Sequence, residues 1–393
     1  MRSLISAAAM ALLLGGCVHK PVEPPPTASL ERVPDDGWPA LTDDSDPASL
    51  RAACRPSIDY LERVPPGRIF TFGPLERSAA ELADGTRRAC EIIATPAGEE
   101  ERRGVLQDEF LLLRSVGRDG RGEVLFTGYY EPLLDARSEA SESFEVPIYG
   151  VPSDLITVDL RDFGVKTDPS RIVGRVHQRQ LVPYHERDAI DFGDGLPTDA
   201  EVIGYVDNPV DAFFLHVQGS GTLVFPDGGR VRAGYAATNG RPYRSIGRLL
   251  IDDGLVSREE MSMQAIRAYL EEHPDELRRV LTYNPSYVFF RALSADGGPL
   301  GCYGEPVTPG RSIATDRRLF PAPVLAWISA AIPTRDGGDE LISRFVLNQD
   351  TGGSIRGPGR VDLFFGQGDA AGELAGRTKH LGELYFLLPK RQE

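Results

Sequence analysis

One stretch decides the fold of this chain: Asp350-Thr351-Gly352-Gly353-Ser354-Ile355-Arg356-Gly357-Pro358-Gly359-Arg360-Val361-Asp362-Leu363-Phe364-Phe365-Gly366. Its pattern predicts a glycine-rich turn followed by a short strand over 361–365. The preceding segment 341–348 is mostly apolar and predicts a partly buried strand that runs into Asp350. The rest of the chain is interpreted outward from these two strands and their turn.

Asp362 is the unusual residue of the second strand, because it lies between Val361 and Leu363. A buried, ionised carboxylate costs several kcal/mol unless it is paired. Such a residue either keeps its proton through a raised pKa or lies at a cleft. The alternative is that the alternation of the strand simply points Asp362 into water. The pattern alone leaves both interpretations open.

The N-terminus predicts an export signal. Arg2 precedes an apolar run over 4–14, which is too short to span a membrane as a helix. The run ends in Leu14-Gly15-Gly16-Cys17, which resembles a lipobox, and the resemblance implies cleavage before Cys17 and lipidation of that cysteine. The alternative is an ordinary signal peptide with an incidental cysteine. A lipid anchor without an Asp after Cys17 predicts a periplasmic protein held by lipid of the outer membrane.

The charge and the distribution of metal-ligating residues argue against two classes of function. The net charge is −15, from 43 basic and 58 acidic residues, and there is no basic patch, so no nucleic-acid partner is expected. The six histidines are scattered, and no C-x-x-C spacing occurs. We therefore expect no metal site and no cofactor.

Three cysteines would remain after processing. Cys54 and Cys90 lie in neighbouring helical stretches, and we expect them to form a disulfide in an exported protein. Cys302 is then left over, as a small residue of the core.

The chain changes character several times. Residues 18–49 are rich in proline and acidic residues and predict a flexible tether. Residues 48–115 follow a helical pattern, including predicted helices over 75–93 and 98–113. Many short strands with turns then suggest a barrel, the clearest being 124–131, 145–149, 213–218, 222–225 and 230–233. Predicted helices over 243–252, 257–272 and 274–284 precede further strands over 286–291, 310–315, 341–347, 361–365 and 381–388.

Five clusters place glycines, amides or tyrosines within or beside apolar runs. Glycines let other groups approach the backbone closely, and tyrosines and amides suit a sugar, which offers a flat apolar face and many hydroxyls. Each cluster alone is typical of a turn between strands, but the five together indicate a glycan site. They are 126–130, 217–221, 239–247, 284–290 and the opening stretch.

These clusters, together with 261–267 and 312–317, resemble the membrane-bound lytic murein transglycosylase A family from about residue 124 to the C-terminus. The resemblance implies a mainly β, α+β protein with a double-psi β-barrel, a smaller inserted β-barrel and a glycan groove between them. The implied organisation is a signal peptide and lipobox (1–17), a tether (18–49), the double-psi barrel with N-terminal helices (50–131 and 276–393) and the inserted barrel (132–275).

The resemblance also implies the chemistry. The family is a carbon–oxygen lyase that cleaves the β-1,4 bond between N-acetylmuramic acid and N-acetylglucosamine of peptidoglycan and leaves a 1,6-anhydro ring. Asp362 would be the single general acid and then base. The glycan strand is the expected partner, and a cell-wall synthesis complex is a further candidate partner. The expected substrate-binding residues are Thr127, Tyr129, Gln218, Tyr243, Arg244, Asp350 and Gly353.

Two other classes compete with this interpretation. Asp350-Thr351-Gly352 also resembles an aspartic-protease loop, but those enzymes need two aspartates that share a proton, and the chain has one such tripeptide. A non-catalytic glycan-binding module with a barrel of the expansin type is the second alternative. Such a binder has no need of Asp362 in an apolar strand, and so the products formed from peptidoglycan distinguish the two.

Overall fold

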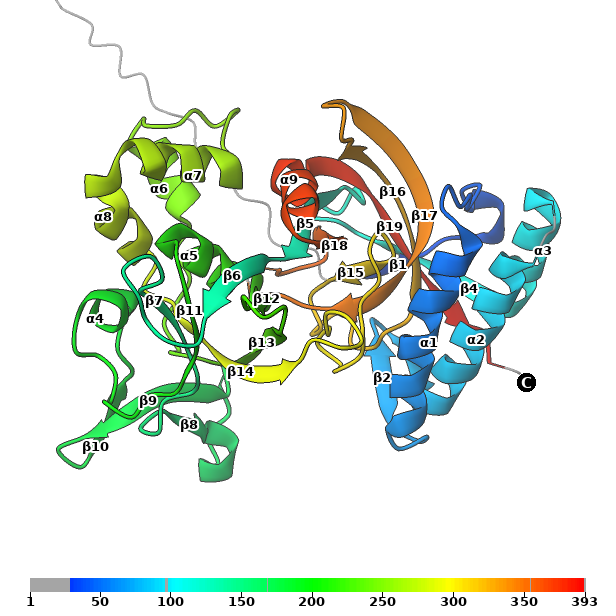
Figure 1. Cartoon of the computed structure of the whole chain (residues 1–393). Coiled ribbons are helices and arrows are strands. Elements are labelled where there is room, and N and C mark those ends of the chain that lie inside the picture. Colours follow the sequence, from blue (N-terminus) through cyan, green and yellow to red (C-terminus); the bar gives the residue numbers. More distant parts are fainter. Residues whose placement is uncertain (1–28, 96–97, 168, 354, 392–393) are drawn as a thin grey trace, which may run out of the picture.

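The computed structural model describes residues 29–95, 98–167, 169–353 and 355–391, and so the predicted lipobox at Cys17 lies outside the described residues. Two lobes lie side by side (Figure 1). One contains a β-barrel covered by the N-terminal helices, and the other contains a second sheet with its own helices. The chain crosses from the first lobe to the second and returns, so the barrel is built from both ends of the chain.

Six strands close the barrel in the order β19-β16-β17-β15-β18-β5, because β5 pairs back with β19. The β15–β17 and β18–β5 pairs are parallel, and the other four are antiparallel. Two further strands, β4 (Phe110–Ser115) and β1 (Leu30–Arg32), extend the sheet beyond β19. The predicted mainly β, α+β fold class is confirmed. The barrel strands are β5 (Val124–Glu131), β15 (Ser312–Ala314), β16 (Leu325–Pro333), β17 (Asp339–Asp350), β18 (Arg360–Gln367) and β19 (Lys379–Pro389).

Alternation along the strands sends one set of side chains into the barrel and the other set outward. Val361 and Leu363 of β18 are buried in the interior, so Asp362 between them lies on the outer face. A second apolar cluster packs the other side of the sheet against three helices, α1 (Pro47–Arg63), α2 (Ala79–Ala94) and α3 (Glu99–Glu109). The disulfide between Cys54 and Cys90 joins α1 to α2, while Cys302 is a partly buried free thiol.

The second lobe is built on a six-stranded sheet in the order β14-β13-β12-β6-β11-β7, and a bridge between Gly150 and Phe290 brings the end of β7 back to β14. A three-stranded sheet, β10-β9-β8, projects from it (Figure 1). The strands are β6 (Leu133–Arg137), β7 (Val146–Tyr149), β8 (Ile156–Asp159), β9 (Arg171–His177), β10 (Gln180–Pro183), β11 (Val202–Val206), β12 (Gly221–Val224), β13 (Arg230–Thr238) and β14 (Val288–Ser294).

The remaining elements are short. The β2–β3 hairpin lies beside α1, and α9 packs on β5 and β18. Their bounds, with those of the helices of the second lobe, are β2 (Ile69–Phe72), β3 (Leu75–Ser78), α9 (Asp369–Arg377), α4 (Arg187–Phe192), α5 (Pro209–Gln218), α6 (Ile246–Asp252), α7 (Met263–Glu272) and α8 (Leu277–Thr282).

One predicted strand is a helix. Residues 213–218 belong to α5, which begins at Pro209 after the Asn208 side chain caps the Val210 N–H. The helix ends at Gly219, whose φ of 81° is the left-handed conformation that glycine adopts at a helix end. The error arose because the segment is apolar on nearly every side, and a short apolar run does not distinguish a buried helix from a strand.

Three predicted helix bounds and one domain boundary are also wrong. Strands occupy 75–78 and 110–115, at the ends of the two helices predicted for the N-terminal region. Ser257 closes a turn with Glu260, and α7 begins only after Ser262, which caps the Ala265 N–H. Finally, β14 belongs to the six-stranded sheet, so the chain returns to the barrel after Ser294 rather than after residue 275.

A buried ion pair joins the two lobes where the chain leaves and re-enters the barrel. Arg232 of β13 donates from Nε to Glu131 Oε1 at 3.0 Å, and the two side chains are 2% and 1% exposed. Arg232 also donates to the carbonyls of Ser294 and Ala295, just after the second lobe ends. Gln367 of β18 donates to the other oxygen of Glu131. Both oxygens of the buried Glu131 carboxylate are therefore bound. We call Glu131 and Arg232 the junction pair.

Candidate active site

Four residues from four adjacent barrel strands form one row on the outer face. The registers pair Asp350 with Ala314, Ala314 with Asp362, and Asp362 with Thr127. Directly paired residues place their side chains on the same face of a sheet. Two carboxylates and a hydroxyl therefore lie in line, with only the methyl group of Ala314 between the carboxylates.

A β-bulge in β17 brings Asp350 into this row. Ile313 pairs with Asn348, but the next residue, Ala314, pairs with Asp350, so Gln349 is the extra residue. The Gln349 amide donates instead to the Ala53 carbonyl and the Ser57 hydroxyl of α1. Without the bulge Ala314 would face Gln349, and the second carboxylate would leave the row.

Asp362 has two polar partners among the described residues. The Thr127 hydroxyl donates to its Oδ1, and Arg360 Nε lies 3.5 Å from the same atom. The side chain is 14% exposed. Burial raises the pKa of Asp362, and Arg360 and Thr127 lower it only in part. A carboxyl with a raised pKa that still reaches the surface is suited to give a proton and take it back.

Asp350 is the second carboxyl of the row, and its pKa is raised as well. Burial raises its pKa to about 6, against the hydrogen bond from the Thr351 N–H, at 2.8 Å, and the influence of the nearby Tyr129 hydroxyl, while the charge of Asp362 raises it further. The pKa of Tyr129 is itself raised, by burial and then by Asp350. The Tyr129 ring packs on Phe364 with ring centres 5.0 Å apart. Thr127, Tyr129, Asp350 and Asp362 thus form one electrostatically coupled group.

The second lobe brings two of its three predicted residues close to this group. The Gln218 side chain accepts from the Tyr130 N–H at 3.3 Å, so Gln218 lies where α5 meets β5. Burial raises the pKa of Tyr243, while its hydroxyl bond to Ser245 and then the charges of Arg360 and Arg187 lower it, so Tyr243 lies within electrostatic range of Arg360. Tyr243 is also 48% exposed and thus accessible to a ligand.

Two predicted residues lie away from the carboxylates. The Arg244 guanidinium stacks 5.9 Å from the centre of the Tyr283 ring, and the backbone N–H of Arg244 donates to the Asn284 side-chain oxygen. Gly353 is exposed in the turn after Asp350, and a side chain there would meet open space. Neither residue shows a contact with the row.

Arg360 is the residue that the sequence prediction missed. It lies two positions before Asp362 on the same strand, so both side chains are on the same face. Its second nitrogen lies 3.4 Å from the Thr127 hydroxyl, and so Arg360 contacts both members of the pair. The alternation of the strand places Arg360 on the same face as Asp362. The predicted strand begins at Val361, however, and leaves Arg360 in the glycine-rich turn.

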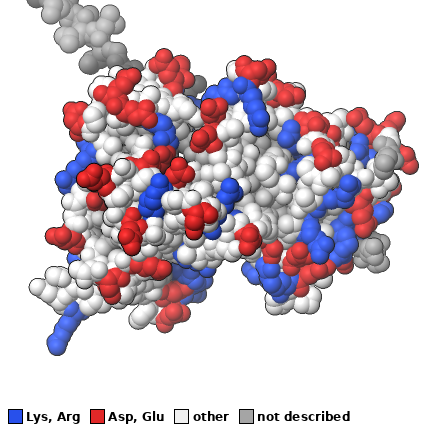
Figure 2. Space-filling view, viewed as in Figure 1, with Lys and Arg blue, Asp and Glu red and all other residues white. Residues whose placement is uncertain are grey.

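The surface between the lobes differs from the rest of the molecule. Figure 2 shows acidic and basic side chains spread over both lobes and few of them where the lobes meet. Within the described ranges, no group of three or more His, Cys, Asp or Glu residues is arranged to hold a metal ion. Nor does any helix in the described part of the chain have the length and apolarity needed to cross a membrane.

Two family models match consecutive parts of the chain. The MltA specific insert domain matches residues 125–291, and the 3D domain matches residues 311–388. The first range takes in β5 and nearly all of the second lobe, and the second covers β15 and most of the strands that follow it.

Curated relatives and solved structures agree with these matches. Membrane-bound lytic murein transglycosylase A of Vibrio cholerae is 35% identical over 277 residues, which are 69% of this chain and 67% of the relative. A membrane-bound lytic murein transglycosylase from Agrobacterium tumefaciens superposes with a TM-score of 0.75 at 33% identity and covers 92% of this chain and 98% of its own. MltA of Escherichia coli with bound chitohexaose has a TM-score of 0.72 at 26% identity, with coverages of 94% and 96%.

The resemblance first noted in the glycine-rich clusters is therefore confirmed by independent comparisons of sequence and of structure. The proteins to which this chain is similar carry the same activity in their names, and they match it over both lobes. The chain belongs to the membrane-bound lytic murein transglycosylase A family, and it is an enzyme of the lytic transglycosylase class.

Proposed function

We propose that this enzyme cleaves the β-1,4 bond between N-acetylmuramic acid and N-acetylglucosamine in peptidoglycan, with Asp362 as its only general acid and base. The observation that carries the proposal is the Asp362 side chain itself. It is mostly buried, its pKa is raised by that burial, and it remains accessible on the outer face of the barrel. The relative solved with bound chitohexaose supports a glycan ligand for this fold.

The reaction needs one carboxyl because the sugar supplies the nucleophile. The Asp362 carboxyl gives its proton to the glycosidic oxygen as the bond from C1 of the muramic acid breaks. The C6 hydroxyl oxygen of the same sugar then attacks C1, and the Asp362 carboxylate takes the hydroxyl proton. The products are a free 4-hydroxyl and a 1,6-anhydro ring, and Asp362 ends protonated. Ordinary glycosidases need a second carboxylate because water must be activated or a covalent intermediate formed.

The neighbours of Asp362 have supporting roles in this proposal. The Thr127 hydroxyl and Arg360 stabilise the carboxylate after it has lost its proton, and they hold its orientation. Asp350, whose pKa is about 6, keeps negative charge close to the carbon that becomes positive in the transition state. Tyr129 lowers the pKa of Asp350 and so favours its ionised form. Gln218, Tyr243, Arg244 and Gly353 remain proposed glycan contacts.

We also propose a periplasmic location with a lipid anchor on Cys17. The curated relatives are named membrane-bound, and the lipobox-like sequence before Cys17 offers a lipidation site. Outer-membrane lipid and a cell-wall synthesis complex are the partners proposed with this location.

The test is product analysis of purified peptidoglycan treated with the fragment 18–393. Mass spectrometry is expected to find anhydro-muropeptides, which are lighter by one water than the products of hydrolysis. Asp362→Asn should lower the rate by roughly a hundredfold to ten-thousandfold, the usual contribution of a general acid or base, and should still bind the glycan. Hydrolysed ends would mean that water is the nucleophile. A dead Asp350→Asn beside an active Asp362→Asn would reverse the roles of the two carboxylates.

A further inference from the structure

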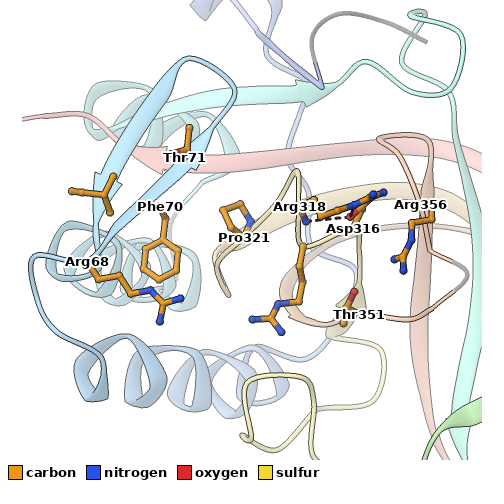
Figure 3. Close-up of a pocket in the computed structure, with 10 residues that line it drawn as sticks. Arg68, Phe70, Thr71, Asp316, Arg318, Pro321, Thr351 and Arg356 are labelled. Atoms are coloured by element: carbon orange, nitrogen blue, oxygen red, sulfur yellow. Dashed lines mark hydrogen bonds and ion pairs between the residues drawn. The ribbon is translucent and has the colours of Figure 1, made fainter. Parts of the chain in front are cut away.

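A concave feature borders the turn that follows Asp350. It is a pocket of about 560 Å3 between the β2–β3 hairpin, the loop after β15 and the turn after β17. Figure 3 shows Arg68 and Phe70 on one side of it and Arg318, Thr351 and Arg356 on the other. We call it the arginine pocket, and it is lined by Arg68, Ile69, Phe70, Thr71, Asp316, Arg317, Arg318, Pro321, Thr351 and Arg356.

The arginine pocket is positively charged within an acidic protein. Its lining contains four arginines and one acidic residue, Asp316, while the whole chain carries −15. Asp316 is bound by Arg318 at 2.7 Å. Burial raises its pKa, but the bonds from Arg318 and the Gly357 N–H outweigh this and hold it at about 2, so Asp316 stays ionised and offsets one arginine only.

The other three arginines have no ion pair with any carboxylate among the described residues. Arg68 lies 5.0 Å from the centre of the Phe70 ring, and Arg317 lies 4.7 Å from that of Tyr303. Arg356 donates to the carbonyls of Gly352 and Ile355. A guanidinium group retains donors when it stacks on a ring, and its planar fork matches a carboxylate. The pocket is thus equipped to bind an anionic ligand with more than one carboxylate.

The position of the arginine pocket relates it to the carboxylate row. Thr351 lines the pocket and directly follows Asp350, whose carboxyl its N–H binds. The Thr351 hydroxyl also donates to the Thr315 carbonyl at 2.8 Å, next to Ala314 of the row. The turn that follows Asp350 therefore connects the carboxylate row to the rim of the pocket.

We propose that the arginine pocket binds the carboxylates of the peptide stem that muramic acid carries on its lactyl group. The inference rests on the proposed function, because it assumes that the muramic acid lies at Asp362. The glycan backbone of peptidoglycan is neutral except where muramic acid loses its peptide, whereas the stem ends in free carboxylates. Arginines at this position would make the enzyme prefer peptide-bearing strands over stripped ones.

The experiment compares glycan strands with intact stems and the same strands after an amidase has removed the stems, which leaves a single lactyl carboxylate on each muramic acid. For wild type, KM should be lower on the peptide-bearing strands. Arg68→Gln combined with Arg356→Gln should raise that KM by roughly tenfold or more, as expected when charge-assisted hydrogen bonds are lost, and leave kcat unchanged. On stripped strands the same variant should match wild type.

The matched control is Arg335→Gln, which removes an exposed arginine from the hairpin between β16 and β17; among the described residues Arg335 has no ion pair. It should change neither KM. Arg68→Lys tests the fork geometry: it keeps the charge and should recover only part of the affinity lost by Arg68→Gln. Equal losses on both substrates, or no loss on either, would overturn the proposal.

A binding measurement separates this inference from the proposed function. The soluble disaccharide-tetrapeptide unit of peptidoglycan is titrated into Asp362→Asn by calorimetry, with and without the two arginine substitutions. Binding that weakens roughly tenfold or more with the substitutions supports the pocket, whatever products the active enzyme makes. Binding that is indifferent to the arginines refutes the pocket even if anhydro products are found. If binding depends on the arginines but no anhydro products form, the proposed mechanism is refuted and the pocket proposal is not.

Discussion

The same pair of strands, β5 and β18, holds two carboxylates in opposite electrostatic situations. At the end of β5 the junction carboxylate, Glu131, is 1% exposed, receives the guanidinium of Arg232 at 3.0 Å and is also bound by Gln367. Four residues earlier on β5, Thr127 faces Asp362, which has a hydroxyl and a guanidinium at the longer distance of 3.5 Å.

The difference between the two sites shows how one scaffold supports structural and chemical carboxylates. A buried carboxylate that is fully paired stays ionised and fixes the geometry around it. A buried carboxylate that is underpaired has a raised pKa and can exchange a proton near neutral pH. Burial alone does not distinguish a carboxylate of a reactive site from a structural one. The number of close hydrogen-bond and ion-pair partners does distinguish them.

Replacement of Arg232 has the largest expected effect, and it tests the fully paired carboxylate, Glu131. Arg232→Met should lower the free energy of unfolding by about 3–5 kcal/mol, because it leaves Glu131 charged and buried without its partner. Urea unfolding at pH 8 measures the change. Asp362→Asn is the contrasting variant and should leave the stability unchanged or higher, because it removes a charge that folding disfavours. Equal destabilisation by both variants would contradict the distinction drawn between the sites.

Asp350 tests whether underpairing has a measurable effect on stability. Its folded pKa of about 6 lies above the ordinary value of 3.8. The raised value means that its contribution to stability is fully present below pH 3.8 and is lost as the pH rises through 6. A shift of this size corresponds to about 3 kcal/mol. Asp350→Asn should therefore be more stable than wild type at pH 8 by about that amount, with little difference at pH 4.

The measurement for Asp350 is the difference in unfolding free energy between the two pH values, so that effects independent of pH cancel. Glu340→Gln, on the same strand but exposed, is the control and should show no such difference. A pH-independent effect of Asp350→Asn would show that the carboxyl is better paired than the structure indicates.

Thr127 gives the smallest expected effect and the most direct view of the proton. Its hydroxyl bond favours the ionised form of Asp362, so Thr127→Val should raise the pKa of Asp362 further. Activity that requires a protonated Asp362 falls as the pH rises through that pKa, and the falling limb should therefore move to higher pH. The loss of a hydrogen bond to a charged group, about 1.5–3 kcal/mol, should also slow turnover by roughly tenfold to a hundredfold.

Thr127→Ser keeps the hydroxyl and should leave the falling limb in place. The rate profile against pH, recorded from the release of anhydro-muropeptides, distinguishes the two variants. If the falling limb moved equally in both variants, or in neither, the Thr127 hydroxyl would have no influence on the pKa of Asp362.

The sequence predicted the members of the site better than it predicted their arrangement. The alternation around Asp362 marked that residue as unusual, because strand periodicity is a local property, and the family resemblance supplied its role and the other predicted barrel residues. The alignment of Asp350 with Asp362 depends on the extra residue Gln349, and a bulge is set by what the bulged side chain binds elsewhere, here α1. Arg360 was missed for a different and local reason, because the predicted strand begins at Val361 although β18 begins at Arg360, two positions before Asp362.

The second lobe shows the same limit for secondary structure. α5 was taken for a strand because its buried sequence lacks a polar face, and only its surroundings make it a helix. β14 was assigned to the barrel because nothing within the strand itself shows that its partner is β13. Pairing between distant segments is the information that single-sequence patterns lack.

The separation of Thr127 and Asp362 has a consequence for the order of folding. The two residues are 235 positions apart, and β19, the last strand of the chain, pairs with β5 and closes the barrel beside them. Contacts between such distant segments form late, because the long loop between them must first be closed. A chain whose C-terminal strand has not yet been synthesised therefore lacks the closed barrel that holds the carboxylate row. The capacity to cut the wall arises only when the C-terminal strand has been delivered.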